Sequence, residues 1–401
     1  MLSSGQRETI WSCTSSWMGQ EMLALSPSTV RTSTLVDLHR CDRRACSASV
    51  AVRLKAMECG KSLQTCRIIL ALLVAGGMVL MGGIPPLGAQ GALDTLQLPL
   101  GLSARFASIP PENPFTAAKV ALGQQLFWDR RWSKTGTVAC VDCHRPDHGW
   151  GDPRQFSLDH VGKLTARHTS TIINRLFSEV QGWAGHRPSL EALLYQLPFT
   201  SPEAVVQNLG AVKGYQEQFQ HVFGTDVTAE GVAQALAAYT RTILSGNAPY
   251  DRFRAGDRQA LSEAAQRGLA LFEGKARCSR CHSGVNFTDE DYHNLGIGMD
   301  KEHPDLGRYT VTQHEADRGA FKTPTLRDVA RSGPYMHDGS LATLEQVVDF
   351  YDTGGHANPW LSSKSRPLHL TAAERTDLVT FLHALSGEIA AEVSSPPQLP
   401  P

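Results

Sequence analysis

Cysteine is nearly absent from the body of this 401-residue chain. Five of its nine cysteines lie within the first 66 residues, and the other four belong to two copies of one short motif. Beyond residue 66 no cysteine outside those motifs is available for a disulfide, so a small disulfide-stapled fold is excluded there. Apolar packing must hold the core instead, and a hydrophobic content of 41% is sufficient for that.

The chain also lacks a basic surplus. Its formal net charge is −1, which divides into +4 for residues 1–92, where nine Lys and Arg face five Asp and Glu, and −5 for the remainder. A protein that binds nucleic acid needs a basic face to displace phosphate counterions. The mildly acidic remainder therefore excludes nucleic acid as the main partner.

The four remaining cysteines form two Cys-x-x-Cys-His motifs, at 140–144 and 278–282. Two thiols at this spacing can form thioether bonds to the vinyl groups of a haem, while the adjacent histidine supplies an axial imidazole. A single Cys-x-x-Cys also suits zinc or a redox disulfide, but two copies followed by histidine favour two covalently bound c-type haems. The expected attachment residues are Cys140, Cys143, Cys278 and Cys281, and the expected axial ligands are His144 and His282.

One long apolar run is present, at residues 68–83. Basic residues precede it, and prolines and small residues follow it, which is typical of an export signal. A start at Met57 would place this signal at the N-terminus, so we interpret residues 1–92 as a spurious N-terminal extension plus a signal peptide at about 57–91. An uncleaved membrane anchor is the alternative, because about 18 apolar residues are borderline for spanning. In both cases the body is expected in the periplasm.

Helical periodicity predominates after residue 115. Lead-in helices are predicted at 116–128 and 262–273, each before one haem motif, and both contain the pattern Gly-x-x-Leu-Phe. Further helices are predicted at 228–244 and, with Thr371 and Glu374 in capping-box register, at 371–386. Since strand-like alternation is scarce, the expected fold class is mainly α.

The repeated lead-in helix predicts two cytochrome c-like haem domains packed together. The sequence Ser-Gly-Asn-Ala-Pro at 245–249 is a stop signal and marks the expected boundary. We therefore expect an N-terminal haem domain at 93–248, a C-terminal haem domain at 249–390 and a flexible tail at 391–401.

The stretches 321–327 (FKTPTLR) and 334–339 (PYMHDG), together with the two haem motifs and their lead-in helices, are similar to motifs of a known family. That family comprises the bacterial di-haem cytochrome c peroxidases and their relative MauG, and the resemblance covers about 118–387. It implies that the N-terminal haem, of His144, reacts with peroxide. The C-terminal haem, of His282, is then expected to relay electrons.

The second axial ligand of the electron-relay haem decides the subtype. Family peroxidases carry a methionine downstream of the Pro-Tyr-x-His-x-Gly motif, whereas MauG carries a tyrosine. Here Tyr351 occupies that position, and of the eight methionines only Met299 and Met336 lie beyond the signal segment. Phenolate ligation lowers the potential, so the resemblance implies that Tyr351 lets the second haem hold an oxidising equivalent as high-valent iron. A packed helix aromatic is the alternative.

Glu203 and Trp183 match two further functional positions of the family. Glu203 corresponds to the distal-pocket glutamate that moves a proton during peroxide cleavage, although residues 200–203 also read as a helix start with a hydroxyl cap and proline. Trp183 corresponds to the tryptophan between the haems that assists electron transfer. An ordinary core aromatic is the alternative for Trp183.

His160 lies 16 residues after His144. At this interval many family peroxidases carry a removable histidine that blocks the first iron until the other haem is reduced, while MauG lacks such a block. A plain exposed loop histidine is the alternative. The sequence thus combines a MauG-like Tyr351 with a peroxidase-like His160.

The family also holds a calcium ion between its haems, using an asparagine side chain and backbone carbonyls. Here His168 stands at the asparagine position, while Ser332 and Pro334 could still offer carbonyls. Calcium prefers oxygen ligands, so this departure weakens the expectation of one calcium ion.

The leading function is a periplasmic di-haem peroxidase that reduces hydrogen peroxide to water, with electrons from a small redox protein such as a cytochrome c or cupredoxin. The alternative is a MauG-like oxidase that acts on aromatic side chains of a partner protein. A third hypothesis, from another class, is an electron-carrier di-haem cytochrome without peroxide chemistry. A homodimer is left open.

Overall fold

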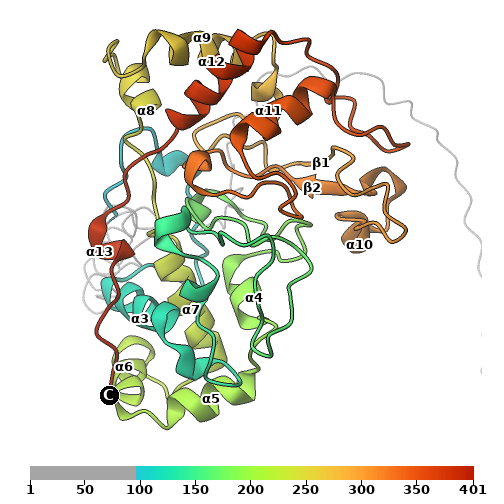
Figure 1. The fold of residues 1–401 in the computed structure, drawn as a ribbon. Coiled ribbons are helices and arrows are strands. Elements are labelled where there is room, and N and C mark those ends of the chain that lie inside the picture. The colour runs from blue at the N-terminus through green and yellow to red at the C-terminus, as the bar shows by residue number, and fades with distance from the viewer. Residues whose placement is uncertain (1–95) are drawn as a thin grey trace, which may run out of the picture. The chain divides into compact units, whose positions relative to one another are not determined.

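The computed structural model describes residues 96–401, and Figure 1 shows their arrangement. Helices dominate this part of the chain, and the strands described there form one small two-stranded sheet. The prediction of a mainly α fold is therefore confirmed. The predicted export signal and the extension before it lie outside the described residues. Among the described residues, no helix is long and apolar enough to cross a membrane.

The α-helices are α3 (Ala117–Trp128), α4 (Leu190–Tyr195), α5 (Pro202–Gly210), α6 (Lys213–Phe223), α7 (Ala229–Thr240), α8 (Pro249–Arg254), α9 (Glu263–Glu273), α10 (Tyr309–Thr312), α11 (Leu344–Thr353), α12 (Ala372–His383) and α13 (Ala391–Ser394). Strands β1 (Tyr292–Asn294) and β2 (Ala320–Lys322) pair antiparallel, with His293 opposite Phe321. Short 3-10 turns connect the helices, and two of them, Cys140–Asp142 and Cys278–Arg280, contain the first cysteine of each haem motif.

A first core forms where α3 crosses α7, and Figure 1 shows these helices side by side. Leu126 and Phe127 of α3 are fully buried, and the Phe127 ring lies 5.2 Å from that of Tyr239 on α7. Gly123 permits the close crossing, because a Cβ atom at this position would overlap the backbone carbonyl of Ala235. The glycine of the Gly-x-x-Leu-Phe pattern is therefore a packing residue.

A second core repeats this packing where α9 crosses α12. Gly268 approaches the backbone carbonyl of Asp377 so closely that a Cβ atom would overlap it. Phe272 lies 5.1 Å from Phe381, centroid to centroid. The repeat detected in the sequence thus corresponds to a repeated helix crossing.

The predicted helix starts agree with the structure. The lead-in helices at 116–128 and 262–273 are confirmed as α3 and α9, and their N-caps are Thr116 and Ser262. The capping box between Thr371 and Glu374 is confirmed at the start of α12. Each of these signals is a local hydrogen bond to a free N–H of the first turn, which explains why the sequence reveals it.

Two helices end earlier than predicted. α7 ends at Thr240 rather than at residue 244, because the chain beyond it is held by contacts with distant segments. The Arg241 guanidinium pairs with Glu191 at 2.6 Å, and the Ile243 carbonyl accepts a hydrogen bond from the backbone of Asn174. α12 ends at His383, and residues 384–386 form a turn.

The last residues of the chain, predicted as a flexible tail, lie against the first core. The Tyr239 hydroxyl donates a 2.6 Å hydrogen bond to the carbonyl of Val393. Arg131 donates to the carbonyl of Pro400 at 2.7 Å, and Gln124 donates to that of Glu392. In Figure 1 this segment runs from α12 through α13 to the C-terminus beside α6.

The crossing of α3 and α7 generates a stability prediction. Replacing Gly123 with Ala should lower the free energy of unfolding by about 1–3 kcal/mol, because the added methyl group meets a backbone carbonyl that cannot rotate away. Chemical denaturation followed by far-UV circular dichroism measures this change. Gly210→Ala is the matched control, since a Cβ atom at the end of α5 has open space around it. Equal stability of the two variants would contradict the prediction.

Candidate functional site

The first cysteine-histidine centre lies on the tight turn after α3. The backbone N–H of His144 donates to the carbonyl of Cys140 at 2.9 Å, so the two thiols and the imidazole are carried by one helical turn. The Nδ1 atom of His144 lies 3.1 Å from the carbonyl oxygen of Trp150 and must be the donor. Burial lowers the pKa of His144 to about 4. The imidazole is therefore neutral at pH 7, and its Nε2 atom is free to bind a metal.

The carbonyl that orients His144 is itself well fixed. The Trp150 side chain is 1% exposed and packs against Phe127 and Tyr239, with ring centroids 5.7 and 6.4 Å apart. The same carbonyl also accepts a hydrogen bond from the backbone of Ile172. The aromatic cluster of the first core thus determines where the His144 ring points.

The second centre has the same geometry. The N–H of His282 donates to the carbonyl of Cys278 at 2.9 Å, and its Nδ1 atom donates to the carbonyl of Phe287 at 3.0 Å. Burial lowers the pKa of His282 as well. Both histidines therefore present a neutral imidazole with Nδ1 occupied by a backbone carbonyl.

Arg327, the last residue of the FKTPTLR stretch, holds the loop that orients His282. Its guanidinium donates two hydrogen bonds to the carbonyl of Val285, at 2.8 and 3.0 Å, and lies over the ring of Phe287. It also pairs with Asp251 at 2.5 Å, and both side chains are only 1% exposed. A buried charge of this kind requires its partner, so this pair fixes the loop firmly.

A large apolar cavity opens beside the second centre, and it tests whether the residues there fit a haem. Its lining includes the two thiols and the imidazole of the motif together with Tyr351 of α11. The cavity is also lined by Trp183, Met336 and His337. Burial raises the pKa of Tyr351, a preference that a bound cation would reverse. Two thiols, an imidazole and a phenol around one apolar space are a donor set that fits a c-type haem.

The structure separates the two methionines of the body. Met336 lines the second cavity, whereas Met299 packs against Gly319 and does not line it.

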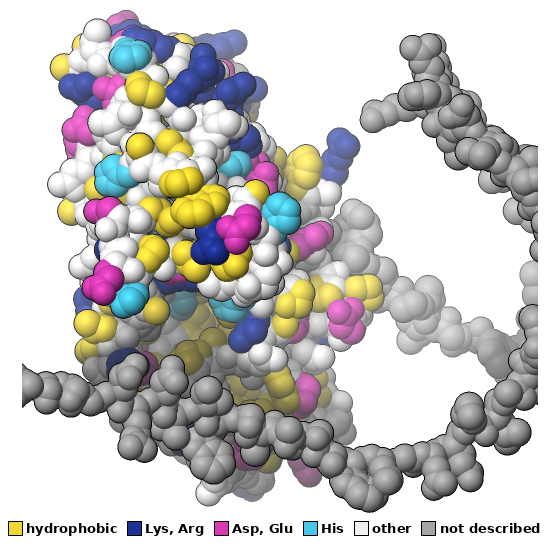
Figure 2. Space-filling model, turned by 90° about the vertical axis from the view of Figure 1, so that its right-hand side faces the viewer, with side chains coloured by type: hydrophobic (Ala, Val, Ile, Leu, Met, Phe, Trp, Pro, Cys, Tyr) yellow, Lys and Arg dark blue, Asp and Glu magenta, His cyan; other side chains and the backbone are white. Residues whose placement is uncertain are grey.

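Arg277, Arg280 and Lys364 also line this cavity. Figure 2 shows Lys and Arg side chains gathered at the end of the molecule where α9 and α11 lie.

Glu203 lies in the first turn of α5, and this helix start is confirmed, with the Ser201 hydroxyl accepting from the N–H of Ala204. Glu203 is exposed, and hydrogen bonds from its backbone and from Ser201 hold its pKa below the ordinary value. The segment before it contacts the first core, since the Thr200 hydroxyl donates to the carbonyl of Trp132.

His160 lies in a hairpin loop closed by the bridge between Leu158 and Leu164. The hydroxyl of Thr135 reaches the carbonyl of His160 at 3.4 Å. The Nδ1 atom of His160 is enclosed and has no hydrogen-bond partner among the described residues. Within that part of the chain, no hydrogen bond joins His160 or Glu203 to His144.

Trp183 lies in the wall of the second cavity and is only partly buried. Its indole Nε1 donates to the carbonyl of His168 at 2.8 Å, and its own carbonyl accepts from the N–H of Lys322. The carbonyl of His168 therefore holds the ring of Trp183, and the N–H of Lys322 holds its backbone.

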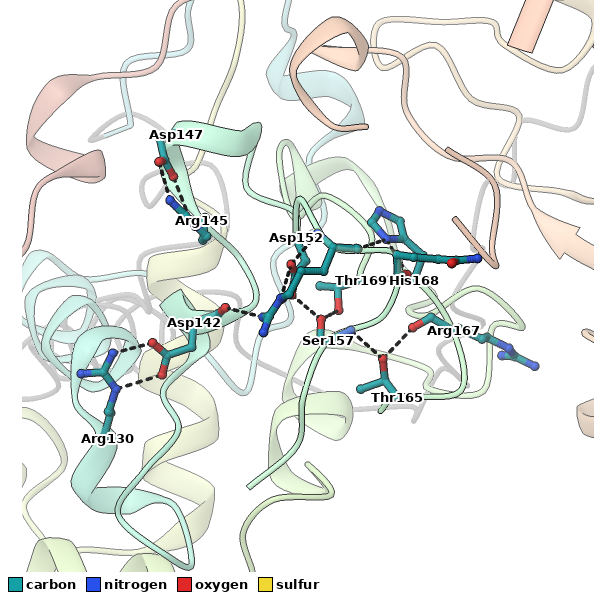
Figure 3. Close-up of polar contacts among 12 residues, drawn as sticks. Arg130, Asp142, Arg145, Asp147, Asp152, Ser157, Thr165, Arg167, His168 and Thr169 are labelled. Carbon is teal, nitrogen blue, oxygen red and sulfur yellow. Dashed lines mark hydrogen bonds and ion pairs between the residues drawn. The ribbon is translucent and has the colours of Figure 1, made fainter. Parts of the chain in front are cut away.

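Residues 168–172 form a segment that contacts both centres, which we call the bridging segment. At one end His168 bonds the carbonyl of His337 through its N–H, at 2.8 Å, and lines the second cavity. At the other end the Thr171 hydroxyl donates to the carbonyl of Gly149, and Ile172 donates to that of Trp150. Figure 3 shows His168 and Thr169 beside the polar network of Asp152.

The residues implied for calcium do not fit that ion. His168, Ser332 and Pro334 line the same cavity, as expected from their positions. The Nδ1 atom of His168 is engaged with the carbonyls of Arg154 and Gln155, at 3.2 Å each, so the side chain offers calcium no oxygen. Calcium prefers six to eight oxygen ligands, and this donor set departs from that preference.

Sequence reasoning missed a polar cluster at the rim of the second cavity. Asp289 accepts hydrogen bonds from His293, at 2.9 Å, and from Lys364, at 3.1 Å. Ligand atoms of Cys281, Asp289 and His293 lie within 4.8 Å of one another. Because Cys281 belongs to the haem motif and the Lys364 ammonium already neutralises the carboxylate, we interpret this cluster as a polar rim.

The sequence also did not reveal that Trp150, Phe287 and Arg327 position the two histidines. Trp150 and Phe287 act through their carbonyls, which no side-chain pattern reveals. Each does follow its histidine by five or six residues, and this shared spacing was the available signal.

The rim carboxylate generates a pH prediction. Burial opposes ionisation of Asp289, yet hydrogen bonds from His293, Thr323 and Lys364 lower its pKa to about 2 from 3.8. A lowered pKa stabilises the fold above pH 4, and that stabilisation is lost as the pH falls toward 2. Asp289→Asn should therefore unfold at a lower temperature than the wild type at pH 7, and the difference should shrink below pH 4. Thermal unfolding across this range measures it, with Asp300→Asn as the exposed control; a difference independent of pH would contradict it.

Comparison with known proteins places these two centres in a family. The family model described as di-haem cytochrome c peroxidase matches residues 117–259. The chain is 40% identical over 351 residues to the methylamine utilization protein MauG of Methylorubrum extorquens, covering 82% of this chain and 98% of that protein. It is 41% identical over 321 residues to the cytochrome-c peroxidase IdrP1 of Denitromonas iodatirespirans, covering 69% of this chain and 84% of that one.

A solved structure agrees with these relatives. A MauG-like protein associated with microbial copper homeostasis superposes with a TM-score of 0.67 at 27% identity, covering 80% of this chain and 99% of that one. The resemblance inferred from the motifs is confirmed. The chain belongs to the family of di-haem cytochrome c peroxidases and MauG, whose members are haem-containing oxidoreductases.

Proposed function

We propose that this protein is a periplasmic di-haem c-type peroxidase that reduces hydrogen peroxide to water. The observation that carries the proposal is the duplicated centre. In each copy two thiols and a buried neutral imidazole share one turn, and a backbone carbonyl holds the Nδ1 atom. The bond orients each imidazole as a metal ligand, and two Cys-x-x-Cys pairs each followed directly by such a histidine favour covalent haem over zinc or a redox disulfide.

The first haem would be held by Cys140, Cys143 and His144, and the second by Cys278, Cys281 and His282. When bound, the haem irons supply two electrons that convert one hydrogen peroxide and two protons into two waters. We assign the first haem to a domain at 93–248 and the second to a domain at 249–390. The separate apolar cores around α3 and α9 support this division.

The two centres differ in what faces the histidine, and this difference assigns their roles. Tyr351 shares the second cavity with His282 and would serve as a second ligand of a haem bound there. We assign Glu203 and His160 to the first centre, where peroxide is expected to react; Thr200, three residues before Glu203, contacts the core around that centre. Glu203, whose lowered pKa keeps it ionised at pH 7, accepts the proton of the inner peroxide oxygen and returns it to the outer one.

This role for Glu203 is tested by Glu203→Gln. The variant should retain both haems, since the residue contacts neither motif, while peroxide turnover falls roughly 10²–10⁴-fold because proton transfer is lost. The pyridine haemochrome spectrum measures haem content, and oxidation of a reduced cytochrome c measures turnover. Glu263→Gln removes the same charge from the first turn of α9 and serves as the control. Turnover at the wild-type level would refute the role.

A second function is favoured by one observation, the presence of Tyr351 in the second cavity. A phenolate ligand lowers the potential of the second haem, which suits withdrawal of electrons from a partner rather than delivery from a donor. Under this alternative the protein oxidises aromatic side chains of a partner protein, as a MauG-like enzyme. The similarity to MauG and to cytochrome-c peroxidases supports both readings equally.

Replacing Tyr351 with Met should raise the reduction potential of the second haem, because thioether sulfur favours the reduced iron more than phenolate does. Tyr351→Phe separates ligation from packing, since it keeps the ring and removes only the oxygen. Spectroelectrochemical titration measures both variants. If Tyr351→Phe matches the wild type in potential and absorption spectrum, Tyr351 is only a packed aromatic.

Rapid mixing with hydrogen peroxide distinguishes the enzymes from a simple electron carrier. An enzyme of either kind changes its Soret absorption within the mixing experiment. A peroxidase then oxidises a small donor, a cytochrome c or cupredoxin, in proportion to the peroxide consumed, while a MauG-like oxidase modifies a protein substrate instead. Absence of any fast spectral change would favour the electron-carrier hypothesis and overturn the proposal.

A further inference from the structure

His168 lies at the point where the bridging segment meets the PYMHDG stretch. It is 4% exposed and forms hydrogen bonds through its backbone N–H, its carbonyl and the Nδ1 atom of its side chain. Its N–H donates to the carbonyl of His337 at 2.8 Å, and its carbonyl accepts from the indole of Trp183 at 2.8 Å. Its Nδ1 atom faces the carbonyls of Arg154 and Gln155.

Because a carbonyl can only accept, the Nδ1 atom of His168 carries the proton and is shared between two backbone oxygens. Gln155 in turn donates from its side chain to the carbonyl of Asp338 at 3.0 Å. The imidazole therefore ties residue 168 to the segment after the first centre, while the backbone N–H of His168 and the side chain of Gln155 reach the PYMHDG stretch. Burial lowers the pKa of His168, so the imidazole is neutral at pH 7.

We propose that His168 is a hydrogen-bonded pin between the two centres and that it makes this junction independent of calcium. The proton on Nδ1 does what a cation would do there, namely hold backbone carbonyls together. The side chain that would have to supply an oxygen ligand supplies a nitrogen donor instead.

Charges around the pin support this inference, because the carboxylates nearby already have cationic partners from the chain. Arg167, adjacent to the pin, pairs with Asp305 at 2.6 Å, and Figure 3 labels Arg167 beside His168. Lys301 reaches the carboxylate of Asp338 at 3.5 Å. Neither carboxylate therefore requires a divalent cation for its neutralisation.

The pin also fixes Trp183. Since the indole donates to the carbonyl of His168, the position of the ring follows the position of the pin. His168 is thus a positioning residue for Trp183 in the wall of the second cavity. This inference concerns the junction and holds for a peroxidase and for a MauG-like oxidase alike, and its tests do not depend on activity.

Metal content and unfolding of the haem-loaded wild-type protein give the first test. We expect less than stoichiometric calcium by mass spectrometry after gel filtration, and the same unfolding temperature in excess calcium chloride and in the chelator EGTA. One calcium per chain, or a lower unfolding temperature in EGTA, would overturn the proposal.

Variants at position 168 give the second test. His168→Ala should lower the unfolding temperature by roughly 2–4 °C in calcium and in EGTA alike, and should shift the fluorescence or near-ultraviolet dichroism of Trp183. His168→Asn restores an oxygen donor, so its unfolding temperature should rise with added calcium. His221→Asn, at an exposed position of α6, is the control.

Either of two results would contradict the pin. His168→Ala could unfold like the wild type, which would show that its hydrogen bonds do not stabilise the junction. His168→Asn could respond to calcium no more than the control, which would show that no oxygen cage surrounds this position. Loss of peroxide turnover plays no part in these outcomes, so failure of the pin and failure of the proposed function remain distinguishable.

Discussion

The hydrogen bond from a buried histidine Nδ1 to a backbone carbonyl is the constraint on which both centres depend. His144 makes it with Trp150, and His282 makes it with Phe287. The bond decides the tautomer, so Nε2 is the nitrogen left free to bind a metal, and it decides the direction of the ring. Burial keeps both imidazoles neutral, which an axial ligand requires.

These carbonyls can orient the histidines only because the surrounding cores fix the positions of the carbonyls. The first is fixed by an aromatic cluster that includes Phe127, and the second by the buried pair of Arg327 and Asp251. Behind each lies a close helix crossing that only glycine allows, at Gly123 and at Gly268. The same local device is therefore supported differently in the two halves of the chain, by ring packing in one and by a charge pair in the other.

The two centres are connected mainly through short backbone hydrogen bonds. The bridging segment reaches the carbonyls of Gly149 and Trp150 on one side and that of His337 on the other. The indole nitrogen of Trp183 donates a hydrogen bond to the same segment, at the carbonyl of His168. Such an arrangement limits relative movement of the two centres.

The sequence by itself determined the features that depend on neighbours along the chain. A haem motif needs one turn of helix, and a cap needs one side chain beside a free N–H, so the cysteine-histidine motifs and the start of α12 were predictable. Tertiary structure alone decided the rest. Arg327 pairs with Asp251, and His168 bonds His337, although these residues lie far apart in the chain. Contacts between distant residues also determine where α7 ends and where the C-terminal segment lies. No local pattern contains such contacts, because they exist only once the cores have packed.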